Sequence, residues 1–589
     1  GGYMDQEGIE RAQGFARYSF KANSDIQVGD RLKFGESILI SQVDRQVQSE
    51  PGIFAGFNSA TNAPYYQPYG DGPLGYNLIN QETVGQGSAT NYLYNTDDRF
   101  TKTTIQTRKV LANFYGELDI LDGLKARTSL GIDYNVGVGD YFTSALPSLN
   151  GGSGSSLLVS ERPIELTLTS AATLQYDKTF GDGDHNIGAL FGFEQTKFRY
   201  DKQRLQGRDL FNENFAATGT TVAGANEADL WTLQGWLGRL TYNYKGKYLA
   251  TANIRRDATS RFAPGNRDQV FPSVSVGWRI TDENFFPKDT KIDDIKLRAG
   301  WGQSGNQFTG LNFAYLSAID NNVRYVIGDD QQTVVAPAPT TFANSDLKWE
   351  TSTQFDIGVD ASFNEGKLTT TFDYYNKTTD DVLIGFPLPY VSGFFLSADA
   401  NIGQIKNSGI EFSFNYANAI GDFNYSIGGN LTTVKNEVTD LGSIPSIISG
   451  IGGASTHRTV VGESLGHFYG YKTDGLYQND AEVAAAVPDA LGTPSPGDIR
   501  FVDVNNDGVV DANDRTILGS PFPGFFYGFV FNAEYKGFDL SMNLRGVGDR
   551  QIFNSARIGL EGMTGQGNFS TQILDRWTGE GTTNSSSNP

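Results

Sequence analysis

The sequence predicts an all-β fold, namely a transmembrane antiparallel β-barrel with about 16 strands visible and long extracellular loops, and three observations carry this prediction. Apolar and polar residues alternate with period two over long segments. Short turns join these segments in pairs. Tyr and Phe collect near segment ends, as at Tyr242, Tyr244 and Tyr248, where the aromatic girdle of a barrel would lie.

Eight predicted hairpins follow one another along the chain, each made of two alternating segments. Most of the short connections contain Gly with Asp, Asn or Lys, which favour turns. The paired segments are 15–26 with 32–43, 109–120 with 124–134, 166–180 with 185–200, 233–244 with 248–256, 271–280 with 295–302, 351–363 with 368–375, 409–418 with 423–434, and 527–535 with 538–547.

The alternation separates two faces cleanly in the segment 538–545. One face carries Phe538, Leu540, Met542 and Leu544, and the other carries Asp539, Ser541, Asn543 and Arg545. A soluble sandwich would alternate in the same way, with its apolar face against a second sheet. The predicted strands have about 9–13 residues, which reaches the 9–11 needed to cross a bilayer, whereas sandwich strands mostly have 5–6. Strand length therefore favours lipid as the cover of the apolar face.

Short turns face the periplasm in outer-membrane barrels, and long loops face outside. This rule makes the connections 44–105, 138–160, 201–228, 305–348, 376–406 and 435–523 extracellular. We therefore interpret residues 1–589 as a single β-barrel domain. Residues 435–523 would form a long extracellular loop of this domain, which contains the acidic stretch 503–514. An open sheet edge is excluded inside a membrane, because lipid cannot satisfy backbone amides.

Composition limits the classes of function. The formal net charge is 46 − 67 = −21, with no cluster of Lys and Arg, so we expect no nucleic-acid partner. The absence of Cys excludes disulfides and thiol catalysis. No run of 18 apolar residues is present, so the sequence offers no transmembrane helix.

One segment carries a pattern seen in hydrolases. Gly462–Gly466 matches G-x-S-x-G, with His457 and His467 close by. That pattern requires a strand, a sharp turn and then a helix, and the sequence predicts no helix after Ser464. Three His in total and no H-E-x-x-H sequence argue against catalytic zinc. We therefore predict that the protein is not an enzyme.

An acidic stretch at 503–514 has the spacing of a twelve-residue calcium loop. Oxygen ligands at alternate positions would surround one Ca²⁺, and Gly508 would allow the sharp turn between them. Asp514 occupies the last position of the loop, where Glu is usual, and its shorter side chain reaches less far toward the cation. A solvated acidic turn is the alternative. The predicted ligands are Asp503, Asn505, Asp507, the backbone carbonyl of Val509, Asp511 and Asp514.

Aromatic residues in the first long loop are candidates for contact with substrate. Tyr65, Tyr66, Tyr69 and Tyr76 could stack on sugar rings or on peptide side chains. Such residues also simply pack loops or lie at the membrane interface.

A series of motifs resembles one family in the same order along the chain. One of these motifs is the run DRTILGSPFPGFFYGF, which begins at the last residue of the acidic loop. It resembles a motif of the SusC/RagA-like TonB-dependent outer-membrane transporters, and six further segments resemble motifs of the same family. The other matching segments are Arg256–Phe262 (RDATSRF), Phe271–Trp278 (FPSVSVGW), Leu297–Asn306 (LRAGWGQSGN), Leu347–Thr351 (LKWET), Asn401–Glu411 (NIGQIKNSGIE) and Val461–Gly466 (VGESLG).

The resemblance implies a barrel of about 22 strands in the bacterial outer membrane, occluded by an N-terminal plug. It also implies a SusD-like surface lipoprotein as partner and energy supplied through TonB. The cargo would be oligosaccharides or peptides too large for porins. The opening GYMDQEGI and the ending DRWTGE resemble elements inside such a barrel. We therefore expect the signal peptide, the plug, the TonB-contacting segment and the last strands to lie outside this sequence.

Two alternatives to active import remain open at this stage. A passive porin or adhesin barrel would show the same alternation but would lack a plug and energy coupling. A secreted β-protein that binds calcium and glycan is the weaker alternative, because long strands with an apolar face need lipid or a second sheet to cover them.

Overall fold

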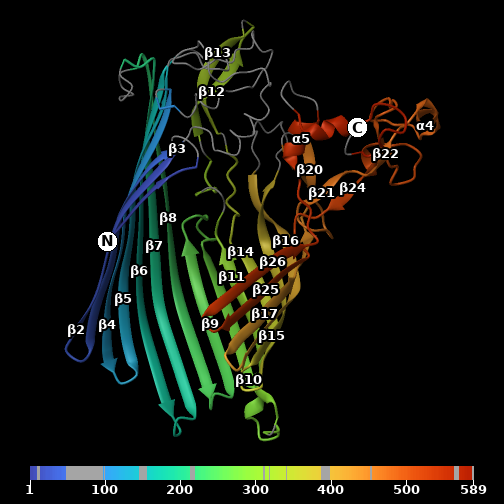
Figure 1. The fold of residues 1–589 in the computed structure, drawn as a ribbon. Helices are drawn as coiled ribbons and strands as arrows, with labels where there is room; N and C mark the ends of the chain where they lie inside the picture. Colours follow the sequence, from blue (N-terminus) through green and yellow to red (C-terminus); the bar gives the residue numbers. More distant parts are fainter. Residues whose placement is uncertain are drawn as a thin grey trace.

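One antiparallel sheet of 18 strands dominates the computed structural model of the chain (Figure 1). Successive strands of this sheet pair in chain order, except that β18 pairs with β16 and β25 pairs with β17. The structure describes residues 1–9, 13–47, 97–98, 100–144, 155–211, 219–288, 290–308, 312–317, 319–329, 331–339, 341–386, 398–451, 454–562 and 569–586.

The sheet is a meander of hairpins, and all eight predicted hairpins are confirmed. Its strands are β1 (Gly2–Glu7), β2 (Gly14–Val28), β3 (Leu32–Val47), β4 (Thr101–Leu121), β5 (Leu124–Thr143), β6 (Leu157–Phe180), β7 (His185–Arg208), β8 (Thr221–Tyr244), β9 (Tyr248–Thr259), β10 (Asp268–Arg279), β11 (Ile292–Asn306), β14 (Glu350–Phe363), β15 (Leu368–Phe386), β16 (Ala398–Ile420), β17 (Phe423–Thr433), β18 (Lys435–Asp440), β25 (Phe525–Tyr535) and β26 (Phe538–Gly548).

Many strands are longer than predicted, and two strands, β1 and β18, were not predicted. β6, β7 and β8 have 24 residues each, so they extend into segments predicted as loops. The upper part of β8 explains the difference, because residues 222–228 are exposed on both faces. Where both faces meet water the alternation disappears, although the backbone ladder continues. Alternation therefore marks the membrane-spanning part of a strand and not its ends.

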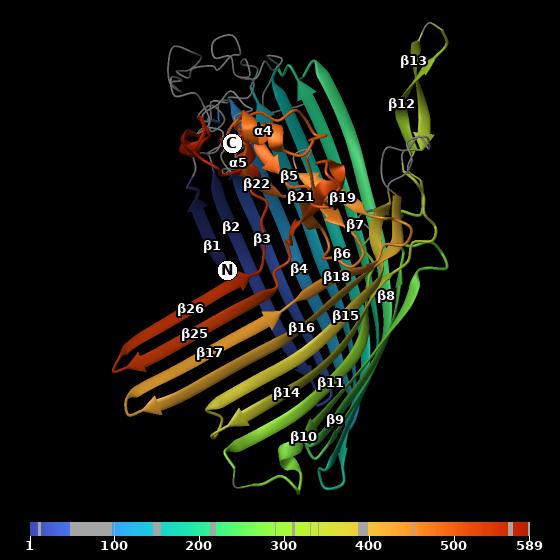
Figure 2. The ribbon, with the colours of Figure 1, turned by 90° about the vertical axis from the view of Figure 1, so that its right-hand side faces the viewer.

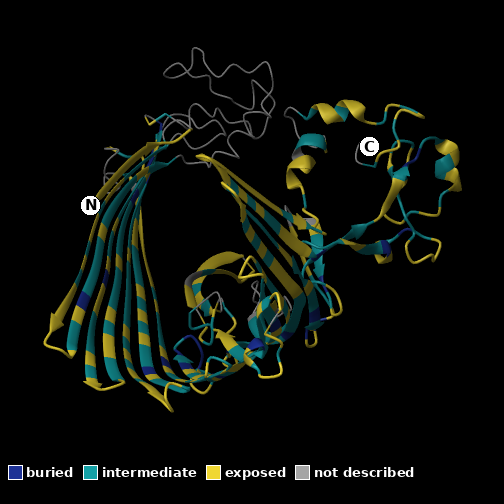
Figure 3. Cartoon of the chain, turned by 60° about the horizontal axis from the view of Figure 1, so that its bottom comes forward, coloured by how far each residue is buried: buried dark blue, intermediate teal, exposed yellow. Residues whose placement is uncertain are grey.

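The two faces of the sheet differ as the alternation predicts. The outer face exposes large apolar side chains, including Phe20 (57%), Ile40 (49%) and Ile254 (56%). Exposed and partly buried residues consequently alternate as bands along the strands (Figure 3). Such an apolar surface is far larger than a soluble monomer tolerates and fits contact with lipid.

The sheet curves around a hollow and has two edges, β1 and β26 (Figures 2 and 3). In the described part of the chain, β1 pairs only with β2, and β26 pairs only with β25. No described helix is long and apolar enough to cross a membrane.

The segment 435–523 contains more structure than a simple loop. Four strands form a second sheet: β19 (Ile447–Ile451), β20 (Ala454–Thr459), β21 (His467–Tyr471) and β24 (Arg515–Gly519). A shorter pair, β22 (Thr473–Leu476) with β23 (Ile499–Phe501), lies next to the helix α4 (Asp480–Ala485). A further hairpin, β12 (Ile319–Ile327) with β13 (Gln332–Pro339), rises separately from the barrel rim (Figure 2).

The end of the chain packs on this segment, beyond the helix α5 (Ser555–Glu561). Asn584 Oδ1 accepts a hydrogen bond from the backbone N–H of Leu476 at 2.8 Å, and Gln478 Nε2 donates to the carbonyl of Thr583 at 3.1 Å. Leu476 (0% exposed) and Tyr477 (3%) are buried there. Residues 447–523 and 569–586 thus form one body with its own small core, which we call the insert unit.

Candidate functional site

The inner wall of the sheet carries charged side chains in pairs. Arg298 of β11 donates from Nε and Nη2 to the two carboxylate oxygens of Asp360 in β14, both at 2.8 Å. Its Nη2 also donates to Asp373 of β15 at 3.1 Å, and Lys296 Nζ lies 3.4 Å from Asp360. Alternation aims these four side chains at the hollow, because Trp301, Phe355 and Phe372 of the same strands are exposed on the other face.

A second charged group lines the same wall further round. Arg255 Nε donates to both oxygens of Asp257 at 2.7 and 2.8 Å, and Arg255 Nη1 lies 3.6 Å from Glu194. Opposite charges within one strand or on nearby strands allow a wall to be polar without a large net charge. The interior can therefore face water, a polar plug or a hydrophilic cargo.

Connections at the upper end of the wall fold against its inner face. Four buried residues form a cluster there. They are Phe262 from the connection between β9 and β10, Phe271 from β10, and Leu347 and Trp349 from the residues before β14. Trp349 packs edge-on against Phe262 and Phe271, with ring centroids 5.9 and 5.5 Å apart. This cluster fixes the shape of the mouth on that side.

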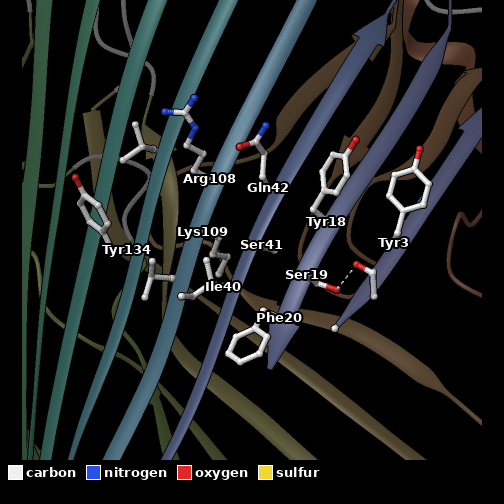
Figure 4. A pocket seen from close by; sticks show the side chains of 14 residues that line it. Tyr3, Tyr18, Ser19, Phe20, Ile40, Ser41, Gln42, Arg108, Lys109 and Tyr134 are labelled. Carbon is white, nitrogen blue, oxygen red and sulfur yellow. Dashed lines mark hydrogen bonds between the residues drawn. The ribbon is translucent and has the colours of Figure 1, made fainter. Parts of the chain in front are cut away.

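A groove lies elsewhere, on the outer face of β1 to β5. It encloses about 860 Å³ and is lined by apolar and aromatic side chains that include Tyr18, Phe20, Ile40 and Tyr134 (Figure 4). None of the predicted calcium ligands, all of which are described, lies in it. Its position on the membrane-facing surface makes it part of the lipid contact and not a route for cargo.

The acidic loop 503–514 turns as predicted. Asn506 and Gly508 have φ of +58° and +88°, which supply the sharp turn. The carboxylates accept hydrogen bonds from backbone amides within the loop. Asp503 Oδ2 accepts from Gly508 N at 2.8 Å, and Asp507 Oδ1 accepts from Val509 N at 3.0 Å.

Asp514 has a role that the spacing alone does not show. It is fully buried, and it accepts from the backbone N–H of Asp511 at 2.7 Å, of Val504 at 2.8 Å and of Asn505 at 3.3 Å. These backbone donors, led by that of Asp511, hold the pKa of the Asp514 carboxyl below its usual value, although burial opposes them. Asp514 therefore joins the two ends of the loop even without a cation.

The oxygen types of this loop suit Ca²⁺, but their arrangement does not converge on one point. Across the described residues, no three His, Cys, Asp or Glu side chains gather closely enough to hold a metal ion. The calcium prediction for Asp503, Asn505, Asp507, Val509, Asp511 and Asp514 stays a prediction.

The other sequence candidates have different outcomes. Tyr65, Tyr66, Tyr69 and Tyr76 belong to residues 48–96, which lie outside the described residues. Ser464 lies in a turn between β20 and β21, and its hydroxyl donates to Ser520 Oγ at 3.0 Å. The G-x-S-x-G segment is thus followed by a strand and not by the helix of a nucleophile elbow.

The charge pairs of the inner wall were missed by sequence reasoning. Arg298 and Asp360 stand on the polar faces of alternating strands, which was the available signal. Their contact depends on pairing between β11 and β14, whose facing ends, Asn306 and Glu350, are separated by the rim hairpin β12–β13. No local pattern gives that register.

A long-stranded antiparallel wall with an apolar outside and a polar inside defines the class of transmembrane β-barrels of the bacterial outer membrane. Comparison with known proteins gives the family. The family model of the TonB-dependent receptor-like β-barrel matches residues 46–545. The chain belongs to this family, as a SusC/RagA-like member, and lies in the outer membrane.

Curated relatives match almost the whole chain. TonB-dependent receptor P3 of Formosa agariphila is 30% identical over 605 residues, covering 98% of this chain and 58% of that protein. TonB-dependent receptor SusC of Bacteroides thetaiotaomicron is 29% identical over 589 residues, covering 95% of this chain and 57% of its own length. The chain thus spans somewhat more than half the length of these relatives.

A solved structure described as the RagAB peptide transporter has the same fold. It aligns with a TM-score of 0.81 at 21% sequence identity, over 98% of this chain and 63% of that one. The predicted barrel architecture is confirmed by this agreement.

Proposed function

We propose that the protein containing this chain imports large nutrients across the outer membrane, energised through TonB and assisted by a SusD-like surface lipoprotein. The observation that carries the proposal is the polar, charge-paired inner wall in a chain of the TonB-dependent receptor family. A hydrophilic oligosaccharide or peptide could pass such a wall, whereas an apolar compound would gain nothing from it.

Energy coupling separates active import from a passive pore. The test uses the full-length protein in its native bacterium, with uptake of a labelled oligosaccharide or peptide mixture measured with and without a proton uncoupler, and in a strain lacking TonB. Active import requires uptake to stop in both cases. Uptake that continues without TonB would identify a passive barrel.

The partner and the membrane location can be tested on the same strain. Affinity purification from outer membranes in mild detergent should bring down a surface lipoprotein in a fixed ratio. Recovery of the protein alone from the soluble fraction would instead favour the secreted calcium- and glycan-binding alternative.

We also propose that the loop 503–514 binds Ca²⁺ in a structural role. Support comes from the spacing of its oxygen groups and from the left-handed conformations of Asn506 and Gly508, which fold the loop back on itself. A carboxylate oxygen that accepts one hydrogen bond retains a second lone pair, which a cation could use.

The calcium test removes charge without removing hydrogen-bond acceptors. We expect the double variant Asp503→Asn with Asp507→Asn to lose terbium luminescence and bound calcium, and to be cut faster by protease within 447–523. Asp422→Asn, which changes an acid in a turn at the opposite end of the wall, is the matched control. Equal metal content in all three proteins would contradict the calcium proposal.

A further inference from the structure

Arg261 occupies an unusual position at the mouth of the barrel. It lies in the connection between β9 and β10 and is only 8% exposed. Its guanidinium lies 4.9 Å from the ring centre of Trp231 in β8 and 5.7 Å from that of Phe308, just after β11. Trp231 in turn stacks on Phe198 of β7 at 5.6 Å. A cation is thus enclosed between two aromatic rings.

The Nε atom of the Arg261 guanidinium lacks a hydrogen-bond partner within the described structure. This atom is buried, and no described carboxylate lies within ion-pair distance of the guanidinium. Burial lowers the pKa of Arg261, opposed by the charge of Asp229. Asp229 is itself engaged by Asn312 Nδ2 and by the backbone N–H of Leu230. A buried N–H group without an acceptor is unfavourable, so the Nε of Arg261 calls for an external acceptor.

Two amide oxygens in the same region lack donors. Gln307 Oε1 and Asn312 Oδ1 are buried without a hydrogen-bond partner in the described structure. Gln307 directly precedes Phe308, which packs on Arg261. Asn312 is fixed by its bond to Asp229, two residues before Trp231. The orientation of the Asn312 amide follows from that bond, because only Nδ2 can donate to a carboxylate.

These residues belong to the inner side of the wall. The exposed apolar residues of β8 include Leu230, Trp236 and Leu240, all at even positions, so Trp231 points the other way. The buried cluster of Phe262 and Trp349 begins directly after Arg261. Phe308 is 66% exposed and covers Arg261 on one side. A cargo entering along the inner wall would therefore meet Phe308 first and reach Arg261 by moving one exposed ring.

We propose that Trp231, Arg261, Gln307, Phe308 and Asn312 form a subsite for one sugar ring of an imported oligosaccharide. This inference rests on the proposed import function and names a substrate class for it. A sugar hydroxyl donates and accepts at once, so neighbouring hydroxyls can accept from Arg261 and donate to Gln307 and Asn312. Phe308 offers its exposed ring to the C–H face of the sugar.

A peptide matches the same groups less well. The unpartnered groups are one guanidinium N–H and two side-chain amide oxygens, and none belongs to a strand edge that could pair with a peptide backbone. A peptide carboxylate would satisfy Arg261 but has no donor of its own for the amide oxygens, which would need separate N–H groups along the peptide, whereas each hydroxyl of a sugar ring both donates and accepts. The mixture of one donor group and two acceptors therefore favours a polyhydroxylated ring.

The test measures binding to the full-length detergent-purified protein by calorimetry. The probes are defined hexaoses of α-1,4-glucose, β-1,4-glucose, β-1,4-mannose and α-1,4-galacturonate, together with a mixture of random hexapeptides. We expect at least one hexaose to bind, and Arg261→Met and Phe308→Ala each to weaken that binding at least tenfold. Gln307→Ala is a milder change and should weaken hexaose binding several-fold. If the Arg261→Met variant does not fold, Gln307→Ala still tests the proposal.

Arg458→Met is the matched control. Arg458 is a half-buried arginine that, like Arg261, has an unpartnered Nε, and it lies 4.7 Å from the Tyr469 ring, but in the insert unit. This variant should bind the hexaose as the wild type does.

Several results would overturn the inference. The first is that the wild type binds none of the hexaoses. The second is that Arg261→Met, Phe308→Ala and Gln307→Ala all leave hexaose binding unchanged. The third is that the protein binds peptides and these substitutions weaken that binding. TonB-dependent uptake measured in parallel keeps the two proposals distinct. If uptake persists while these substitutions change nothing, only the subsite fails, and if uptake does not depend on TonB, the import proposal fails.

Discussion

The wall of the sheet and the insert unit place their apolar side chains in opposite ways. The wall turns Leu240, Ile254 and other large apolar residues outward, where they are 53% and 56% exposed. The insert unit buries Leu476, Tyr477 and Val510 at 0–3% exposure. The wall therefore depends on lipid for its apolar contacts, whereas the insert unit has a core of the soluble kind.

This difference teaches that the two regions have separate sources of stability. Backbone ladders join every strand of the wall to its neighbours, so a local defect is shared among many hydrogen bonds. The insert unit rests on a few buried side chains and on contacts with residues 569–586. Substitutions should therefore affect one region and spare the other.

The largest effect is expected in the core of the insert unit. Leu476→Ala should destabilise that unit by about 2–5 kcal/mol, because it leaves a cavity at a fully buried position. Limited proteolysis should then cut within 447–523 while the barrel keeps its heat-modifiable mobility on a gel. Leu518→Ala, at an exposed position, is the control. Loss of the barrel's mobility shift in Leu476→Ala would show that the two regions are not independent.

The converse substitution tests the wall. Leu240 faces outward between Ala189 and Ala252 of the neighbouring strands. Leu240→Arg should destabilise the barrel in lipid vesicles by up to about 2–4 kcal/mol, since a charge on the lipid-facing side of a strand is unfavourable. Ser275→Arg, on the inner face of β10, should cost much less. Equal effects of the two arginines would mean that both faces have the same environment.

A smaller, pH-dependent effect is expected at Asp514. Its folded-state pKa is lowered by backbone donors, so its stabilising contribution is present above the unfolded-state pKa and is lost as the pH falls through the folded-state pKa. Asp514→Asn should speed proteolysis of the insert unit at neutral pH. The difference from the wild type should shrink in acid, below the usual carboxyl range. A difference that grew in acid would contradict the hydrogen-bonding role.

The smallest effect is expected for the charge pairs of the inner wall. Asp360 is 35% exposed and Arg298 is 30% exposed, so water screens their interaction. Asp360→Asn should destabilise the barrel by about 0.2–1 kcal/mol, measured as a shift in the urea midpoint. The shift should decrease at high salt. An effect above that range, insensitive to salt, would indicate a structural role for Asp360 beyond pairing.

The sequence predicted the wall far better than the insert unit, for a physical reason. Strand pairs such as 233–244 with 248–256 are local, and their alternation follows from having lipid on one side. The insert unit joins Leu476 to Asn584 and Asp489 to Val510, pairs that no short window brings together. The same limit applies to Asp514, since spacing suggests a ligand but only the fold shows its three backbone donors. It applies also to Arg261, whose aromatic neighbours are Trp231 in β8 and Phe308, two residues after the end of β11.

The contacts of residues 569–586 also bear on the order of folding. Each wall hairpin can pair as soon as its second strand has been made, because its partners are close in sequence. Gln478 must instead wait for Thr583, 105 residues later, before its side chain finds that carbonyl. The insert unit is therefore expected to complete its folding later than the wall hairpins. Until its last residues arrive, the buried face of Leu476 is the part of the chain most in need of protection by a chaperone.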